Sequence, residues 1–121
     1  MFEVEVTLPL ELKHRLKGFG EDISKPHEHS WNVTVTCCTK SLDKRGVSVD
    51  FMKLTEILNR LLEPLQGQLL NSHPPFDQIP PTAENIAVWV AEGIHKSYPN
   101  LVKGVTVGSA HEKARYLMYN H

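Results

Sequence analysis

Alternation of apolar and polar residues is the pattern that most limits how this chain can fold. In residues 2–8, apolar side chains alternate with Glu3, Glu5 and Thr7, and the same period of two runs through residues 31–37. This period gives an extended strand one apolar and one polar face. Both segments are therefore predicted to be strands, and we expect them to pair with each other.

Two later segments have the period of an amphipathic helix. From residue 51 to residue 65, apolar residues recur at intervals of three and four, after Asp50, which is placed to cap a helix, and Pro64 should end or kink it. A second helix is predicted after Thr82, with a buried side formed by Ile86, Ala87, Val90 and Ile94. The four prolines of residues 71–81 predict a rigid irregular loop between the helices.

The last third of the chain predicts two more strands, joined by a polar link around His111 and Glu112. They run through Val102, Val105 and Val107, and through Tyr116, Met118 and Tyr119. The order β-β-α-α-β-β indicates a single α+β domain over residues 1–121, with a four-stranded antiparallel sheet and two helices on one face. Because free sheet edges favour association, we expect a homo-oligomer.

Composition narrows the classes of partner and location. Thirteen Lys and Arg against fourteen Asp and Glu give a net charge of −1, which excludes the basic field that nucleic-acid binding requires. Acidic residues interrupt the first apolar segment and no later stretch approaches the length of a membrane span, so we expect a cytoplasmic protein with no membrane partner. The adjacent Cys37 and Cys38 are predicted to be reduced packing residues.

Three histidines are placed as metal ligands. His27 and His29 flank Glu28 just before the second strand, and in extended backbone their imidazoles project from one face, within reach of one ion at about 2.1 Å. Hairpin pairing would bring His14, at the end of the first strand, close to them. Three imidazoles without a fourth protein ligand are typical of a catalytic zinc site with one open position. On these residues alone, surface histidines are an equally good interpretation.

Five short motifs occur in order along nearly the whole chain. They are Leu10 with His14-Arg15-Leu16, His27-Glu28-His29, residues 47–54, Leu69-Leu70-Asn71, and Pro81-Thr82-Ala83-Glu84-Asn85. Together they resemble the 6-pyruvoyltetrahydropterin synthase and 6-carboxytetrahydropterin synthase family. The resemblance implies the tunnelling fold and a zinc ion bound by His14, His27 and His29. It also implies a pterin-like substrate, for which Thr82 is a candidate binding residue, and a homohexamer of two stacked trimers.

The chain departs from this family at the positions that carry protons and hold the pterin. The family's cysteine is replaced by Ile23, its Asp-His relay by Gln66 and Gly67, and its pterin-anchoring glutamate by Ser109. A positioned base contributes about 10²- to 10⁴-fold in rate, so without a replacement the family reaction should be slow.

Replacement groups are present nearby in the sequence. Glu21, His73 and His111 are candidate catalytic proton carriers, and Glu112, three residues beyond the vacant anchor, is a candidate substrate-binding residue. Each is also explained as an ordinary solvated loop residue. Two functions therefore stay open. The first is a zinc-dependent lyase of the pterin-synthase type with altered proton carriers, acting on dihydroneopterin triphosphate or a related pterin. The second is a catalytically silent zinc protein that binds a pterin or purine-like ligand. We favour the enzyme. The open ligand position speaks against a purely structural zinc.

Overall fold

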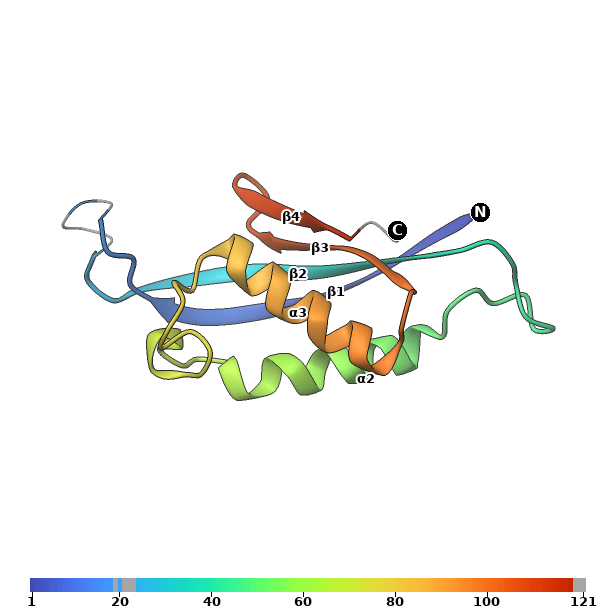
Figure 1. Cartoon of the computed structure of the whole chain (residues 1–121), viewed down its shortest axis with the longest axis horizontal. Coiled ribbons are helices and arrows are strands. Elements are labelled where there is room, and N and C mark those ends of the chain that lie inside the picture. The colour runs from blue at the N-terminus through green and yellow to red at the C-terminus, as the bar shows by residue number, and fades with distance from the viewer. Residues whose placement is uncertain (19, 21–23, 119–121) are drawn as a thin grey trace.

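Four strands and two helices form the molecule, and they follow the predicted β-β-α-α-β-β order (Figure 1). The computed structural model describes residues 1–18, 20 and 24–118. The elements are β1 (Phe2–His14), β2 (His27–Thr39), α2 (Phe51–Leu62), α3 (Ala83–Ser97), β3 (Val102–Gly108) and β4 (Lys113–Leu117), with short 3₁₀ turns at Glu63–Leu65 and Leu70–Ser72. The sheet is antiparallel in the order β1-β2-β3-β4, and both helices cover one of its faces, which confirms the predicted α+β architecture.

Two predicted strand boundaries need correction. The histidine pair does not precede the second strand, because β2 already begins at His27, where pairing with His14 of β1 extends the ladder. The fourth strand ends at Leu117, so Met118 follows it, and Tyr119 lies outside the described residues.

The strands differ in length, and this difference leaves part of β2 without a partner from β3. β1 and β2 pair over their whole length, from Phe2 opposite Thr39 to His14 opposite His27. Pairing of β2 with β3 ends earlier, at Asn32 opposite Gly108. Residues 27–31 of β2 therefore project past the end of β3.

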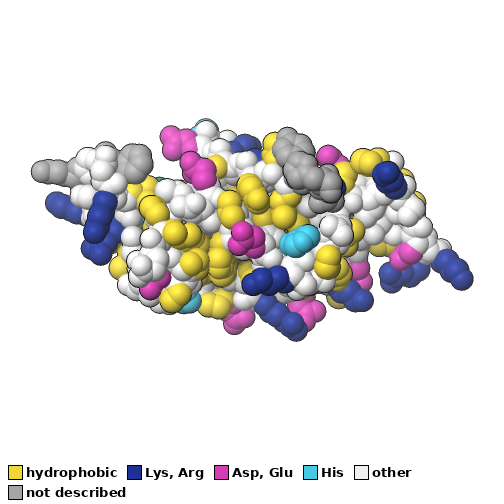
Figure 2. All heavy atoms as spheres, in the orientation of Figure 1, with side chains coloured by type: hydrophobic (Ala, Val, Ile, Leu, Met, Phe, Trp, Pro, Cys, Tyr) yellow, Lys and Arg dark blue, Asp and Glu magenta, His cyan; other side chains and the backbone are white. Residues whose placement is uncertain are grey.

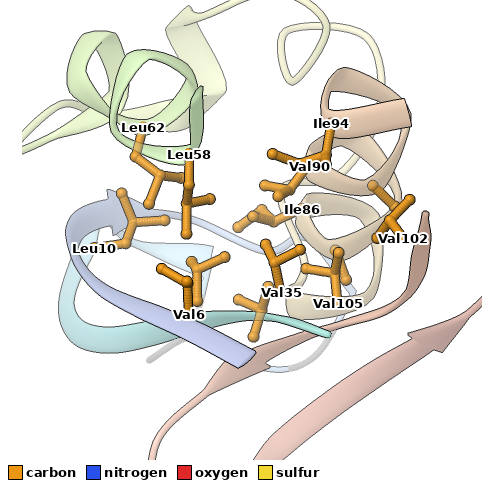
Figure 3. Close-up of a cluster of buried hydrophobic side chains, with 14 of the residues drawn as sticks. Val6, Leu10, Val35, Leu58, Leu62, Ile86, Val90, Ile94, Val102 and Val105 are labelled. Atoms are coloured by element: carbon orange, nitrogen blue, oxygen red, sulfur yellow. The ribbon is translucent and has the colours of Figure 1, made fainter. Parts of the chain in front are cut away.

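The hydrophobic core lies between the helices and the sheet. Alternate residues of β1, β2 and β3 face the apolar sides of α2 and α3, as Figure 3 shows. The labelled core residues include Val6, Leu10, Val35, Leu58, Leu62, Ile86, Val90, Ile94, Val102 and Val105. The helices approach closely at Gly93, where an added Cβ would lie 2.8 Å from a methyl carbon of Leu61.

Local signals in the sequence explain where the helices begin and end. The Asp50 carboxylate accepts hydrogen bonds from the backbone N–H groups of Met52 and Lys53, and the Thr82 hydroxyl accepts one from Asn85 at 3.1 Å, so both predicted caps are confirmed. Pro64 lies in the 3₁₀ turn that follows α2, in agreement with its predicted role.

The molecular surface combines apolar and charged areas. Figure 2 shows apolar side chains gathered over the helical layer, with many Lys and Arg side chains toward the ends of the molecule. Both cysteines are free, and burial raises the pKa of the Cys37 thiol to about 11, with Cys38 adding to the shift, so the Cys37 thiol stays protonated at neutral pH. Within the described residues, no helix has the length and apolar character that crossing a bilayer requires.

Replacing Leu58 by alanine tests the core directly. Leu58 is fully buried, so we expect its truncation to lower the free energy of unfolding by about 2–5 kcal/mol. The matched control is Met52→Ala, on the same helix at 83% exposure, which should change stability by about 0.5 kcal/mol or less. Urea unfolding at one protein concentration measures both, and equal losses would contradict this account of the core.

Candidate metal centre and substrate site

Strand pairing brings three imidazoles together at one end of the sheet. His14 ends β1 directly opposite His27, and His29 lies two residues along β2, on the same face. The ring centroids lie 4.6 Å apart for His14 and His27, 4.8 Å for His14 and His29, and 4.9 Å for His27 and His29. One nitrogen from each ring lies within 4.8 Å of the others. These three residues are called the histidine cluster below.

Hydrogen bonds orient two of the three rings. Nδ1 of His14 donates to the backbone carbonyl of Pro81 at 2.8 Å, and Nδ1 of His27 donates to that of Lys25 at 3.0 Å. In neutral rings this leaves each Nε2 with a lone pair. Backbone carbonyls commonly orient metal-binding histidines in this way.

His14 supplies the strongest sign that the cluster is built for a ligand. Its side chain is 1% exposed, and its Nε2 is buried without a hydrogen-bond partner among the described residues. An unsatisfied buried acceptor costs about 1–3 kcal/mol, and a metal ion would satisfy it. Zinc fits the donor set, because imidazole nitrogen is one of its preferred ligands and the three rings leave a fourth position open.

Electrostatics favour the protonation state that metal binding needs. Burial lowers the pKa of His14, and the neighbouring His29 and His27 lower it further, against an opposing effect of the Pro81 carbonyl. Burial also lowers the pKa of His29, with His27 acting in the same direction and Glu112 in the opposite one. Neutral imidazole is the form that binds zinc.

An aromatic ring fixes the third imidazole. Trp31 stacks on His29 with ring centroids 4.5 Å apart and planes at 22°, and it meets His14 edge-on at 5.3 Å. From the sequence alone, Trp31 is most simply a core or interface aromatic. Its place two residues after His29 on the same strand face is the signal that would have revealed this contact.

A hollow of about 550 Å³ opens beside the histidine cluster. Besides the three histidines it is lined by Leu16, Ser30, Trp31, Thr82, Ala83, Glu84, Ser109, Glu112 and Lys113. The predicted substrate-binding residues Thr82 and Glu112 thus lie with the predicted metal ligands. His73, at the end of the second 3₁₀ turn, and His111 do not line this hollow, and Glu21 lies outside the described residues.

A tight turn between β3 and β4 carries Glu112. The Ser109 hydroxyl accepts hydrogen bonds from the N–H groups of His111 and Glu112, and the Ser109 N–H donates to the Glu112 carbonyl at 2.7 Å. Gly108 has φ 146°, and a Cβ there would lie 2.3 Å from that carbonyl oxygen. Ser109, at the family's anchor position, therefore shapes the turn that holds Glu112 beside the histidine cluster.

The positions of the family's relay pair serve a structural purpose here. Gln66 accepts a hydrogen bond from the Glu11 N–H at 2.9 Å and donates to the Pro9 carbonyl at 2.8 Å, and the Gly67 N–H donates to the Glu11 carbonyl. Asn71 makes a similar pair of bonds to the backbone of Arg15, just after His14. These contacts hold the β1 backbone at Pro9 and Glu11, before His14, and at Arg15, just after it.

Comparison with known proteins gives consistent matches along the chain. The family model described as 6-pyruvoyl tetrahydropterin synthase matches residues 3–118. A dihydroneopterin monophosphate aldolase from Pyrococcus furiosus is 32% identical over 83 residues, which cover 69% of this chain and 68% of that protein.

Solved structures of low sequence identity share the fold. The 6-pyruvoyl tetrahydropterin synthase of Caenorhabditis elegans superposes with a TM-score of 0.84 at 19% identity, covering 98% of this chain and 96% of that one. The Plasmodium vivax 6-pyruvoyl tetrahydropterin synthase gives a TM-score of 0.70 at 18% identity, covering 99% of this chain and 100% of that one. These matches confirm the predicted tunnelling fold.

Removing two histidines tests the metal centre. We expect the purified protein to carry about one zinc ion per chain, in keeping with one histidine cluster, and a His27→Ala, His29→Ala variant to lose it, because one imidazole cannot hold the ion. His73→Ala is the control and should keep its zinc, since His73 lies outside the cluster. Elemental analysis measures both, and full zinc content in the double variant would remove the proposed site.

Acidification should destabilise the metal-free protein. The pKa of His14 and of His29 is lowered on folding from the ordinary value of 6.5, so the unfolded chain binds protons more readily as the pH falls through 6.5. Stability should be fully present above this pH and decline below it. Thermal unfolding of chelator-treated protein measures the effect, and His14→Gln should show a weaker decline. An equal decline in both proteins would show that His14 does not contribute to the pH dependence of stability.

Proposed function

This chain belongs to the 6-pyruvoyl tetrahydropterin synthase family, and from this premise we propose that it is a zinc-dependent lyase acting on the side chain of a phosphorylated dihydropterin. The observation that carries the proposal is the histidine cluster, with its unpartnered buried Nε2, at one side of a hollow that also contains Glu112. The hollow, at about 550 Å³, is of the size that small-molecule sites have.

Cleavage of a carbon–carbon bond is the reaction that the site favours. The relative from Pyrococcus furiosus is an aldolase by name. The relay positions used by the synthases are occupied here by Gln66 and Gly67, which hold the β1 backbone. A retro-aldol cleavage needs one base beside the side-chain hydroxyls, and this site offers a carboxylate there.

The proposed reaction is a retro-aldol cleavage between the first and second carbons of the pterin side chain. A base removes the proton from the hydroxyl on the second side-chain carbon, which becomes an aldehyde as its bond to the first side-chain carbon breaks. The released electron pair passes into the carbon–nitrogen double bond of the dihydropterin ring, and the first side-chain carbon then takes up a proton. The products are a hydroxymethyl dihydropterin and a two-carbon aldehyde, which carries the phosphate if the substrate is phosphorylated on its third side-chain carbon.

Each residue of the site has a part in this scheme. His14, His27 and His29 would hold the zinc ion, which supplies Lewis-acid polarisation of the side-chain oxygens when bound. Glu112 is the proposed proton carrier, because it lines the hollow and its charge acts on the His29 ring. Thr82 borders the same hollow and is proposed to contact the substrate.

The other proposed proton carriers have less support from the geometry. His73 and His111 do not line the hollow in the described part of the chain, and Glu21 stays a prediction from the sequence. Glu84 lines the hollow but occupies the first turn of α3, where the helix dipole accounts for an acidic residue.

Self-association and location complete the proposal. The outer edge of β4 has no strand partner within the described chain, and residues 66–71 hydrogen-bond the outer edge of β1 only from Pro9 onward. Closing the free parts of both edges against other copies would satisfy their backbone groups. We propose a homo-oligomer, specifically the hexamer that the family resemblance implies, in the cytoplasm. Light scattering at micromolar concentration tests the assembly, and a monomeric mass would contradict it.

Replacing Glu112 by glutamine tests the proposed reaction. The zinc-loaded protein is incubated with 7,8-dihydroneopterin phosphates, and the hydroxymethyl dihydropterin is measured by its fluorescence after oxidation. We expect Glu112→Gln to lower kcat by about 10²- to 10⁴-fold while zinc stays bound, because the proton carrier is lost. Glu63→Gln, in the 3₁₀ turn after α2, is the control and should leave kcat unchanged.

Two outcomes would overturn parts of this proposal. Unchanged turnover in Glu112→Gln would place the proton carrier elsewhere. Binding of zinc and a pterin by the unmodified protein without any turnover would instead support the catalytically silent binding protein.

A further inference from the structure

The face of the sheet that the helices leave open carries a polar row across all four strands. Pairing places Thr7 opposite Thr34, Thr34 opposite Thr106, and Thr106 opposite Arg115. The hydroxyls of Thr7 and Thr34 lie 2.8 Å apart, and Nε of Arg115 donates to the Thr106 hydroxyl at 2.9 Å. The row thus presents hydroxyl groups and ends on a fixed guanidinium.

The next row toward the histidine cluster has a gap in its middle. Asn32, Gly108 and Lys113 are neighbours in register, and Gly108 contributes no side chain. The close approach of the Glu112 carbonyl at Gly108 excludes any larger residue there. A hollow of about 370 Å³ lies over this gap, and its lining includes both Lys113 and Arg115.

Charge in this hollow is predominantly positive. Its lining contains the two cations and one carboxylate, that of Glu5. Glu5 lies one row beyond the threonine row, opposite Thr36, whose hydroxyl donates to it. The part of the hollow around Gly108 is therefore surrounded by Lys113, Arg115, hydroxyl groups and the Asn32 amide. Several donors around a small space suit the oxygens of a phosphate group.

This hollow adjoins the one beside the histidine cluster. Ser109 and Lys113 line both of them. The two hollows meet at the end of β3, which stops opposite Asn32, so that strand end borders both the helix-covered face and the open face. Ser30, on the projecting part of β2, also lines the histidine-side hollow.

We propose that Lys113 and Arg115 form a phosphate-binding subsite for the substrate handled at the histidine cluster. The inference rests on the proposed function for the identity of that substrate, a phosphorylated dihydropterin. Its side-chain oxygens lie at the histidine cluster, and its phosphate ester extends past Ser109 and Lys113 to the space over Gly108. Lys113 supplies an ammonium group on a flexible side chain. Arg115 supplies a planar guanidinium group, which the Thr106 hydroxyl holds in place.

The subsite is tested without turnover, using inorganic phosphate and inorganic tripolyphosphate as probes. Isothermal titration measures their affinity for the intact protein and for a Lys113→Met, Arg115→Met variant. We expect the affinity of the double variant to fall about tenfold or more, because two charged donors are lost. Lys53→Met, Arg60→Met is the matched control: both side chains are exposed on α2, the charge change is the same, and the affinity should not change.

The same titration separates this inference from the proposed function. The His27→Ala, His29→Ala variant should still bind the inorganic probe, since the subsite does not need the metal. Equal affinities in the intact protein and the Lys113, Arg115 variant would overturn the subsite whatever the catalytic activity is. If the protein has no lyase activity, and probe binding is lost only in the Lys113, Arg115 variant, the proposed function is overturned and the phosphate-binding subsite stands.

A second measurement compares KM for substrates that differ in the number of phosphate groups. If the proposed reaction is observed, Arg115→Met should raise KM for dihydroneopterin phosphates about tenfold and leave KM for unphosphorylated dihydroneopterin unchanged, because Arg115 does not line the histidine-side hollow. A larger effect on the triphosphate than on the monophosphate would identify the longer ester as the ligand that reaches the subsite. A KM that rises equally for the unphosphorylated compound would overturn recognition of phosphate.

Discussion

The register of the β1–β2 hairpin is the constraint on which the rest of the structure depends. Pairing over the whole length of both strands puts His14 opposite His27 and leaves His29 on the same face. A slip of one residue would turn every side chain of one strand to the other face, and it would separate the histidines while exposing the core. The burial of Leu10 and Leu12 on the same strand face as His14 therefore also fixes the geometry of the histidine cluster.

Periodicity and capping residues were enough to predict most of the fold. Alternation identified β1 and β2, the three-and-four spacing identified α2, and Asp50 and Thr82 marked where the helices begin. These signals are local, since each depends on residues within one element. The end of β4 was harder to place, because its alternation continues past Leu117 into Met118, while the pairing with β3 stops at Leu117.

The parts of the site that the sequence did not reveal depend on contacts between distant segments. Gln66 looked like a missing relay residue, and its hydrogen bonds to β1, across more than fifty positions, cannot be inferred from its neighbours. Ser109 looked like a missing anchor until the turn to Glu112 was seen. A substitution at a family's functional position therefore does not by itself mean that the position has lost its purpose.

The unequal lengths of the strands explain how one small sheet can offer two chemically different surfaces to one ligand. The side of β2 that carries His29 faces the helices, and the side that carries Asn32 faces away from them. A ligand bound on one face of a continuous sheet would have no path to the other. Because β3 ends at Gly108, the polar backbone and side chains at that strand end border both spaces. A long substrate with a metal-binding middle and an anionic end matches this arrangement better than a compact one does.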